Sequence, residues 1–387
     1  MLSGLRLLTV IFLAAGMFFY PREVLSAAAG GLSLWWQYVL PALLPFFILS
    51  ELLMAQGIVH FLGVVLEPLM RPLFRLPGKA AFVVAMGYTS GFPMGAVLTS
   101  RLREEGALTR AEGEHLLAFT NNPSPGFMFG AVASGMLGRP DVGVVLAGSV
   151  YLANLLVGLL FRYYRPSGVN EKIAPGSVRR AWQEMNLAKI NDGRPFGRVL
   201  GDAIRQSINT VLAVGGFMAF FAVIIRLLTI WHITTHIATL FNPLLHFVLP
   251  KAAVESLLNG LLEMTLGCQG VINAFGGLTA QLGALAYLMG WSGISVFAQV
   301  ASFTAKTDLR LRVFFVARIF HSLIALIICQ LFLRQFKLPV AKPVMIPHST
   351  TEIILNTWRQ SAEIFFIAGL VLITLLLLLR FTWIGGR

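Results

Sequence analysis

Gly87-Tyr-Thr-Ser-Gly-Phe-Pro-Met-Gly95 and Gly260-Leu-Leu-Glu-Met-Thr-Leu-Gly267 are polar, glycine-rich stretches that interrupt otherwise apolar sequence. Each follows a similar short segment, Phe74-Arg-Leu-Pro77 in one case and Phe247-Val-Leu-Pro250 in the other. Paired interruptions of this kind, at matching positions in two copies of a unit, point to the binding site of a membrane transporter. We therefore interpret the chain as two copies of one unit.

A second polar interruption follows in each copy. The first, Phe119-Thr-Asn-Asn-Pro-Ser-Pro-Gly126, contains two prolines, which remove helix donors and force a helix to break. The second, Ser302-Phe-Thr-Ala-Lys-Thr307, contains no proline. We expect a broken helix over 106–138 and, by analogy with it, another over 278–306.

The composition is that of a polytopic membrane protein. Of 387 residues, 57% are hydrophobic and only 12% are charged, whereas about 25% are charged in soluble proteins. The net charge of +13 comes from short loops and indicates topology, and no basic stripe with interleaved aromatic residues predicts a nucleic-acid partner. The two cysteines and seven histidines show no metal-ligand spacing, so we expect neither a metal nor a cofactor.

Apolar length and bounding Gly, Pro and charged residues predict the membrane crossings. They are 5–20 (a signal peptide being the alternative there), 32–56, 141–163, 208–229, 311–333 and 361–380. The more polar stretches 58–77 and 231–250 are typical of helices that lie along the membrane surface. We interpret 79–103 and 251–275 as re-entrant hairpins, whose irregular tips must be covered by protein or water.

These assignments divide the chain into five parts. They are an N-terminal helix (1–27), a first repeat (28–163), a basic cytoplasmic linker (164–207), a second repeat (208–335) and a C-terminal segment with a last crossing (336–387). Three crossings per copy is an odd number, so the copies should insert with opposite orientation. The predicted fold is an all-α polytopic membrane protein with two inverted repeats, each with a re-entrant hairpin and a broken helix.

Glu263 is the most informative single residue, because a carboxylate at membrane depth is costly and usually functional. It could couple a proton or a sodium ion, bind substrate, or cap the backbone amides at the second hairpin tip. The remaining candidates for substrate contact surround the four interruptions, where hydroxyls, amides and freed backbone groups gather. They are Thr89, Ser90, Gly91, Thr120, Asn121, Asn122, Ser124, Thr265, Ser302 and Thr304. Helix capping is the alternative role for Asn and Ser residues at the first break.

Motifs of the common enzyme classes do not occur in the sequence. It contains no nucleophile elbow, no paired zinc histidines on a helix and no phosphate-binding Walker loop. Facilitated or ion-coupled movement of a solute is the activity that the pattern favours, and we do not expect an enzyme.

Met86–Ala96, Ala118–Asn122 and Leu262–Gly267 resemble the YlbJ-type sporulation integral membrane proteins, the stage V sporulation dipicolinate transporters. That family belongs to a wider set with a nucleoside-recognition gate domain, and its architecture is similar to that of concentrative nucleoside transporters. The resemblance implies transport of dipicolinic acid, from mother cell to forespore, across the outer forespore membrane. It also implies that Ser90, Gly91, Thr120, Asn121, Glu263 and Thr265 line the site. Asn122-Pro123 stands where the family pattern would place smaller residues.

The function implied by this resemblance is transport of a small anion, with the lipid bilayer as a partner, and the sequence leaves an oligomer open. Two alternatives remain open at this point. One is transport of a nucleoside or another small solute, and the other is a membrane scaffold that recruits partners through 164–207.

Overall fold

The computed structural model describes residues 2–164, 177–245 and 249–335, and within these ranges the chain is helical and contains no strand. The elements are α1 (Leu2–Phe19), α2 (Pro21–Leu34), η1 (Trp35–Val39), α3 (Leu40–Ala55), α4 (Ile58–Phe74), α5 (Ala80–Thr89), α6 (Met94–Glu104), α7 (Arg110–Thr120), η2 (Gly126–Met136), η3 (Pro140–Val142), α8 (Gly143–Phe161), α9 (Val178–Asp192), α10 (Phe196–Ile230), α11 (Ile233–Leu245), α12 (Lys251–Leu262), α13 (Met264–Ala274), α14 (Leu278–Trp291), α15 (Gly293–Thr304) and α16 (Leu311–Gln335). The predicted all-α class is confirmed.

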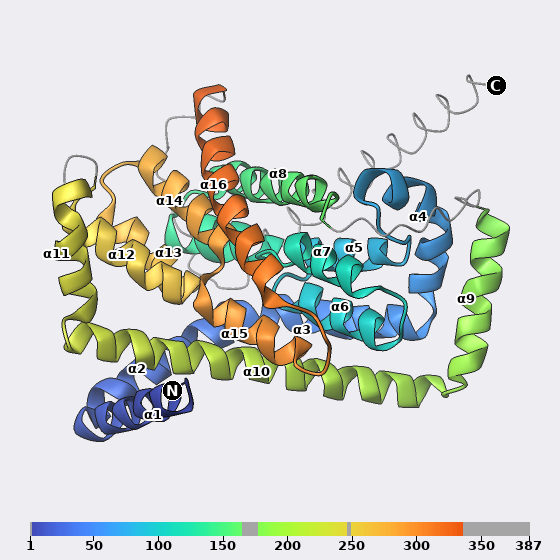
Figure 1. The fold of residues 1–387 in the computed structure, drawn as a ribbon, viewed down its shortest axis with the longest axis horizontal. Coiled ribbons are helices and arrows are strands. Elements are labelled where there is room, and N and C mark those ends of the chain that lie inside the picture. Colours follow the sequence, from blue (N-terminus) through green and yellow to red (C-terminus); the bar gives the residue numbers. More distant parts are fainter. Residues whose placement is uncertain (1, 165–176, 246–248, 336–387) are drawn as a thin grey trace.

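Four helical segments among the described residues are long and apolar enough to cross a membrane: Pro140–Phe161, Phe196–Ile230, Leu278–Thr304 and Leu311–Gln335. They confirm the expected crossings at 141–163, 208–229 and 311–333. The predicted crossing 361–380 lies outside the described residues. In Figure 1 the long helix α10 runs along the length of the molecule, with α3, α7 and α8 extending in a similar direction.

The N-terminal region differs from the expectation of simple crossings. Leu7–Phe19 and Pro21–Val39 are bent by 103° relative to each other, because α2 begins at Pro21, which cannot donate to the preceding turn. The predicted crossing 32–56 begins in the last turn of α2 and continues through η1 and α3. At Gly57, whose φ is +78°, the chain turns by 82° into α4. A helix nearly perpendicular to α3 fits the prediction that 58–77 follows the membrane surface.

Both predicted hairpins are present as helix–turn–helix pairs. α5 and α6 are joined by Ser90–Pro93, and α12 and α13 are joined at the single non-helical residue Glu263. Gly260 and Gly267 lie at the α12–α13 crossing, where a Cβ on Gly267 would fall 2.0 Å from the Gly260 Cα. The second hairpin is therefore closed tightly at its tip by two glycines.

The two broken helices differ in where they break. The first breaks at Asn121–Pro125, between α7 and η2, as its prolines predict. The second does not break at 302–307. It breaks at Ser292 and Gly293, whose φ angles of +79° and +84° end α14 and redirect the chain into α15. Two successive residues in the left-handed conformation interrupt a helix without any proline. The position of the second break therefore could not be inferred from prolines.

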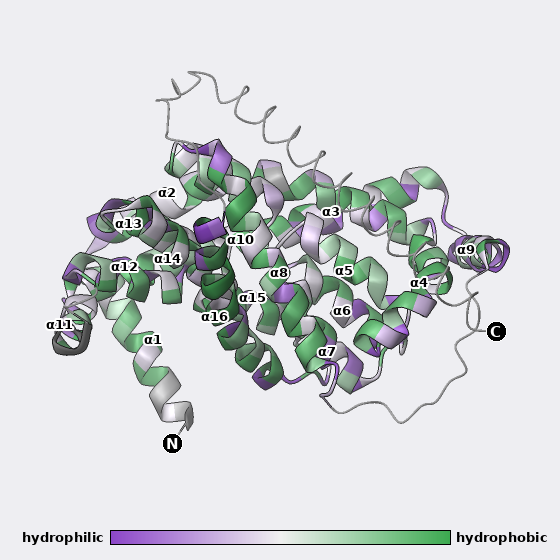
Figure 2. Cartoon of the chain, turned by 90° about the horizontal axis from the view of Figure 1, so that it is seen from above, coloured by the Kyte–Doolittle hydropathy of each residue, from purple (hydrophilic) through white to green (hydrophobic). Residues whose placement is uncertain are grey.

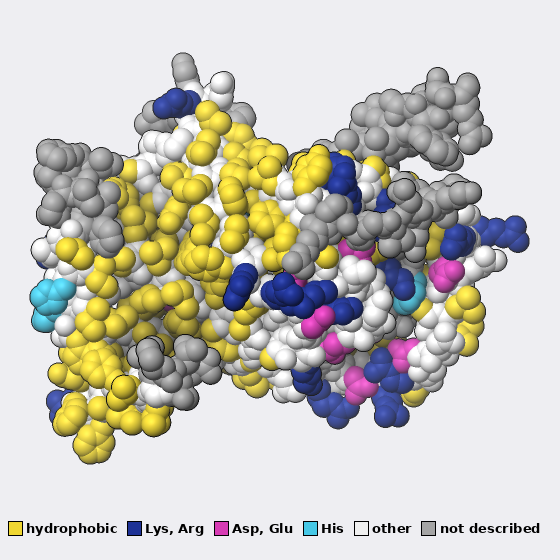
Figure 3. Space-filling view, viewed as in Figure 1, with side chains coloured by type: hydrophobic (Ala, Val, Ile, Leu, Met, Phe, Trp, Pro, Cys, Tyr) yellow, Lys and Arg dark blue, Asp and Glu magenta, His cyan; other side chains and the backbone are white. Residues whose placement is uncertain are grey.

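The described part of the basic region between the copies is largely helical. Its described part contains α9, which packs against α4, and α10 already begins at Phe196, so the proposed boundary at residue 207 falls inside a continuous helix. Figure 2 shows hydrophilic residues concentrated on α9, at one end of the molecule. In Figure 3 charged side chains gather at that same end, whereas hydrophobic side chains cover most of the opposite half. We call the region around α9, the start of α10 and the end of α6 the basic end.

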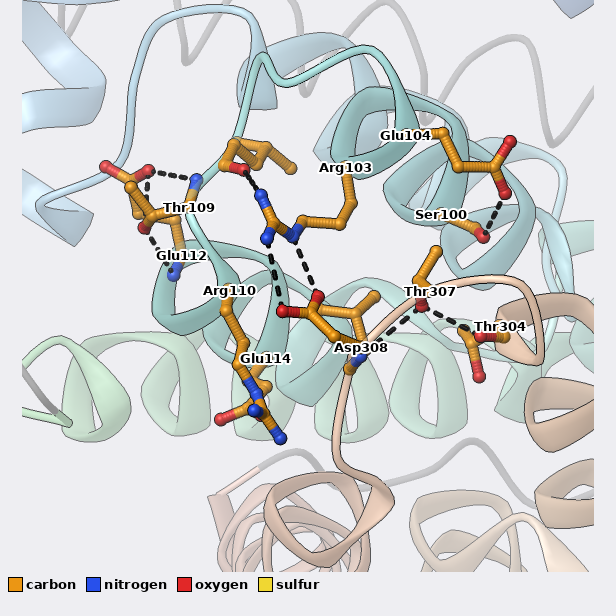
Figure 4. Close-up of polar contacts among 12 residues, drawn as sticks. Ser100, Arg103, Glu104, Thr109, Arg110, Glu112, Glu114, Thr304, Thr307 and Asp308 are labelled. Atoms are coloured by element: carbon orange, nitrogen blue, oxygen red, sulfur yellow. Dashed lines mark hydrogen bonds and ion pairs between the residues drawn. The ribbon is translucent and has the colours of Figure 1, made fainter.

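At the basic end the two halves are joined by polar contacts (Figure 4). Arg103 of α6 forms a two-fold ion pair with Asp308, at 2.9 and 3.1 Å, in the loop before α16. The same loop donates the Arg310 backbone N–H to the Glu114 carboxylate of α7 at 3.0 Å. α7 itself begins with a capping box formed by Thr109 and Glu112. The loop between α15 and α16 is thus fixed to the first half.

Candidate functional site

The tip of the first hairpin closes around the end of α7. A Cβ on Gly87 would fall 2.1 Å from the Thr120 carbonyl oxygen, and a Cβ on Gly95 would fall 2.3 Å from it. Gly91, with φ +83°, approaches the Ser124 backbone so closely that a Cβ would lie 2.7 Å from its nitrogen. The three glycines of the first motif therefore let the hairpin backbone pack directly on the helix break.

The side chains at the end of α7 are used to hold this break. Thr120 donates its hydroxyl to the Leu116 carbonyl at 2.7 Å, and Asn121 donates its amide to the Leu117 carbonyl at 3.1 Å. The Asn121 Oδ1 accepts from the Ala96 backbone N–H of α6 at 3.0 Å. Both residues are fully buried, so their described contacts connect the break to the first hairpin.

The second hairpin tip is a capped helix start. The Glu263 side chain accepts a hydrogen bond from the Leu266 N–H at 2.8 Å and so caps α13. The α14–α15 break touches this tip, because a Cβ on Gly293 would lie 3.0 Å from the Met264 nitrogen. The Trp291 indole donates to the Leu261 carbonyl at 3.0 Å. In each half, therefore, the hairpin tip contacts the break of its own broken helix.

A small, partly open cavity of about 60 Å³ lies between the two tips. Its polar lining consists of Ser124 from the first break, Glu263 and Thr265 from the second hairpin tip, and Gln299 from α15. The rest of the lining is mainly apolar and aromatic: Tyr38, Val39, Leu43, Phe92, Pro123, Phe127, Val214, Met218, Met264 and Val296. The cavity brings together groups from both halves, with four polar side chains in an otherwise apolar interior.

Two helix starts point to this cavity. Ser124 accepts from the Phe127 N–H at 3.1 Å at the start of η2, and Glu263 caps the start of α13. The partial positive charge of a helix N-terminus favours anions. In the observed conformation the Glu263 carboxylate occupies that position at α13, so an incoming anion would compete with it.

Several buried polar atoms near the cavity lack a partner among the described residues. They are the Gln299 Oε1, which belongs to the lining, the Ser295 hydroxyl on the same helix, the Ser90 hydroxyl at the first tip and both amide atoms of Asn122. All four side chains are at most 3% exposed. Buried polar groups are nearly always hydrogen-bonded in proteins, so these atoms are available to bind water or a polar ligand.

Arg318 holds the first break in place and was not among the residues predicted from the sequence. It is fully buried in α16 and donates to the carbonyls of Ala118 and Asn121, at 2.6 and 2.7 Å, and to the Asn154 side chain at 3.0 Å. No carboxylate of the described residues forms an ion pair with it. An arginine in the middle of an apolar crossing was the available signal. It holds the carbonyl end of α7, where the helix dipole is negative.

The structure places the predicted site residues in three groups. Ser124, Glu263 and Thr265 line the cavity. Ser90, Gly91, Thr120, Asn121 and Asn122 lie at the first break and its hairpin, next to the lining, and Thr89 bonds to the Ala85 carbonyl of its own helix. Ser302 is exposed and Thr304 donates to the Val300 carbonyl, both in the last turn of α15 and outside the cavity. Gln299, on the same helix, is the lining residue that the sequence did not suggest.

Comparisons with known proteins agree with this architecture. A family described as Gate: Nucleoside recognition matches residues 36–159. The chain is 42% identical, over 83% of its length and 80% of the relative's, to the sporulation integral membrane protein YlbJ of Bacillus subtilis strain 168. It is also 26% identical to an uncharacterized protein of Alkalihalophilus pseudofirmus, over 42% of this chain and 38% of the relative. No solved structure matches it. With these similarities and its apolar crossings, the chain belongs to the YlbJ family of multi-pass sporulation integral membrane proteins.

Proposed function

We propose that this protein transports a small anionic metabolite, dipicolinic acid in the first instance, across the outer forespore membrane from mother cell to forespore. The observation that carries the proposal is the cavity between the tip of the second hairpin and the break of the first half, with a buried carboxylate and an unpaired amide oxygen in its wall. Interrupted helices that meet at a polar cavity in apolar surroundings are the architecture of secondary transporter sites.

The chemistry of the cavity suits a flat anion. The starts of η2 and α13 can each donate backbone N–H groups to a carboxylate, and Ser124, Thr265 and Gln299 add side-chain donors. Phe92 and Phe127 provide aromatic surface for a planar ring. The two carboxylates of dipicolinate flank its ring nitrogen, and each could engage one of the two helix starts.

Glu263 gives the site a means of coupling. A charged carboxylate in the wall would repel an anionic substrate, so substrate binding requires that Glu263 take up a proton or pair with a cation. A protonated Glu263 can still accept from the Leu266 N–H through its carbonyl oxygen, so the cap of α13 is compatible with the loss of negative charge. Proton or cation uptake and anion binding would then favour each other.

Transport also requires the cavity to widen. Its 60 Å³ can hold a few water molecules, whereas ligand pockets typically measure about 300–1,000 Å³. The observed conformation then corresponds to a contracted state, and movement of the second hairpin relative to α7 and η2 would open the space. Such rearrangements of packed helices are the usual basis of alternating access.

A nucleoside is the second candidate substrate, because the family that matches residues 36–159 is described as nucleoside recognition. A neutral nucleoside would use the same amide and hydroxyl groups without needing a change at Glu263. The two candidates thus differ in the predicted effect of pH on uptake.

Uptake into proteoliposomes that contain the purified protein tests both. We expect accumulation of labelled dipicolinate, faster at low external pH, and little uptake of labelled uridine. Uridine uptake without dipicolinate uptake would favour the second candidate. Protein-free liposomes are the control, and absence of uptake of either solute would contradict transport of both. In an endospore-forming host, complementation of a deletion strain should restore the dipicolinate content of spores.

A further inference from the structure

Two solvent-open hollows lie next to each other at the basic end. One measures about 520 Å³ and the other about 360 Å³, and both are lined by Arg194, Asp202 and Gln206. The larger hollow continues along α10 to Asn209 and Thr210. The smaller extends to the ends of α3 and α6, where Glu51 pairs with Arg101 at 2.9 Å. Together they form one polar recess, which we call the vestibule.

The vestibule and the cavity lie on the same faces of two neighbouring helices. On α10, Thr210 lines the vestibule while Val214 and Met218 line the cavity, each four residues further on. On α15, Phe303 lines the vestibule and Gln299, four residues earlier, lines the cavity. Residues four apart share a helix face, and four residues rise about 6 Å. About one helical turn on each helix therefore separates the two spaces.

Phe303 is chemically unlike the rest of the larger hollow. The other described residues of that lining are Arg194, Asp202, Arg205, Gln206, Asn209 and Thr210, all polar. Phe303 is partly buried and packs against the central hydrophobic core. Within this lining, Phe303 lies one helical turn along α15 from Gln299 of the cavity.

We propose that the vestibule is the entrance through which the substrate reaches the cavity from the basic end, and that Phe303 is the residue that closes this entrance. The inference rests on the proposed transport function and assigns it a route. Charges in the mouth nearly balance, since its linings carry the basic residues Arg101, Arg194 and Arg205 and the acidic residues Glu51, Glu104, Glu105 and Asp202. Such a wall admits a hydrated, small polar solute and leaves selection for charge to the cavity behind it.

Labelling of Gln299→Cys tests the closure without depending on transport. Cys268 and Cys329, both buried, are first replaced by serine, and a membrane-impermeant thiol reagent is applied from the basic end. Because Gln299 is 3% exposed, we expect slow labelling. Phe303→Ala should accelerate it roughly tenfold, which corresponds to a shift of about 1.4 kcal/mol toward the open form, whereas Phe303→Leu should leave it nearly unchanged. Equal labelling rates with Phe303, alanine and leucine would overturn the role of Phe303.

Modification of Thr210→Cys tests the route. Thr210 lines the vestibule, and the matched control Leu212→Cys lies on the same helix but is 56% exposed on its outer surface. A bulky thiol reagent should reduce uptake severalfold in Thr210→Cys and have little effect in Leu212→Cys. Uptake that is unaffected by modification of Thr210→Cys would overturn the route while leaving transport itself established. Absence of uptake in every variant, the unmodified protein included, would instead count against the transport function.

Discussion

The two halves of the molecule build the contact between hairpin tip and helix break in different ways. In the first half, glycines at the tip surround the Thr120 carbonyl, and the break extends over Asn121–Pro125. In the second half the break is confined to Ser292 and Gly293, and the tip itself is the single residue Glu263. The first half therefore contributes a rigid backbone contact between Gly87, Gly95 and the Thr120 carbonyl, which we call the frame. The second half contributes Glu263, the residue whose charge can change.

Substitution of a frame glycine should have the largest effect. A Cβ at Gly95 or Gly87 would overlap the Thr120 carbonyl oxygen, so Gly95→Ala and Gly87→Ala should each destabilise the protein by about 3 kcal/mol or more, at the upper end for overpacking. Thermal unfolding in detergent measures this. Gly216→Ala is the matched control, since its helical Cβ would meet nothing within 4 Å. Unfolding temperatures for the frame variants equal to that of Gly216→Ala would show that the frame is not rigid.

Loss of Arg318 should rank second, because this residue of the second half holds the break of the first. Arg318→Gln removes charged hydrogen bonds to the carbonyls of Ala118 and Asn121, and we expect a loss of about 3 kcal/mol. The exposed Arg312 on the same helix provides the control, and Arg312→Gln should change stability little. If both variants unfold at the same temperature, the break does not depend on Arg318.

Substitution of Glu263 should affect stability less and transport more. Glu263→Ala removes the α13 cap, with an expected loss of about 1 kcal/mol, whereas Glu263→Gln keeps an acceptor for the Leu266 N–H. The glutamine variant should therefore fold normally but lose the dependence of uptake on pH. Initial rates between pH 5 and pH 8 measure this. If Glu263→Gln takes up substrate at the wild-type rate at every pH, Glu263 does not couple transport to a proton or cation.

The contact between the halves at the basic end should contribute least. Arg103 holds the pKa of Asp308 below its usual value through their hydrogen bonds. A carboxyl with a lowered pKa stabilises the fold above its usual pKa, and this contribution is lost as the pH falls through the folded-state value. Because both side chains are partly exposed, Asp308→Asn should cost less than about 1 kcal/mol at neutral pH.

The difference in the free energy of unfolding between wild type and Asp308→Asn should become smaller in strong acid, where the wild-type carboxyl is protonated. Glu105→Gln, at an exposed position at the end of α6, is the control. A stability difference that instead increases as the pH is lowered would contradict a stabilising ion pair between Arg103 and Asp308. A large effect on uptake would indicate that the contact takes part in opening and closing the basic end.

The sequence predicted the parts of the site that depend on strong local signals. Prolines 123 and 125 marked the first break, the glycines of 87–95 marked the first tip, and Glu263 was conspicuous by its charge in an apolar segment. The second break was misplaced because left-handed backbone at Ser292 has no obligatory residue type. Ser292 follows Glu263 at nearly the sequence distance at which Asn121 follows Ser90, so closer use of the repeat would have located it. The inversion of the two copies stays a prediction.

Gln299 and the vestibule could not be predicted in the same way. A glutamine in an apolar helix is compatible with many roles, and its position in the cavity wall depends on how α15 packs against α10 and α12. The vestibule arises where the first half of α10 meets the ends of α3 and α6, an arrangement that local sequence does not encode. Tertiary packing decides these features.

Ligand binding to a Gln299 variant tests most directly whether the cavity between the halves is the substrate site. Affinity is measured on purified protein for whichever of dipicolinate and uridine is taken up, with Gln299→Leu compared with Gln330→Leu, whose glutamine lies on α16 and outside the cavity lining. Gln299→Leu should weaken binding by about tenfold, a loss of about 1.4 kcal/mol, and Gln330→Leu should bind like wild type. Unchanged affinity in Gln299→Leu would contradict the assignment of the cavity.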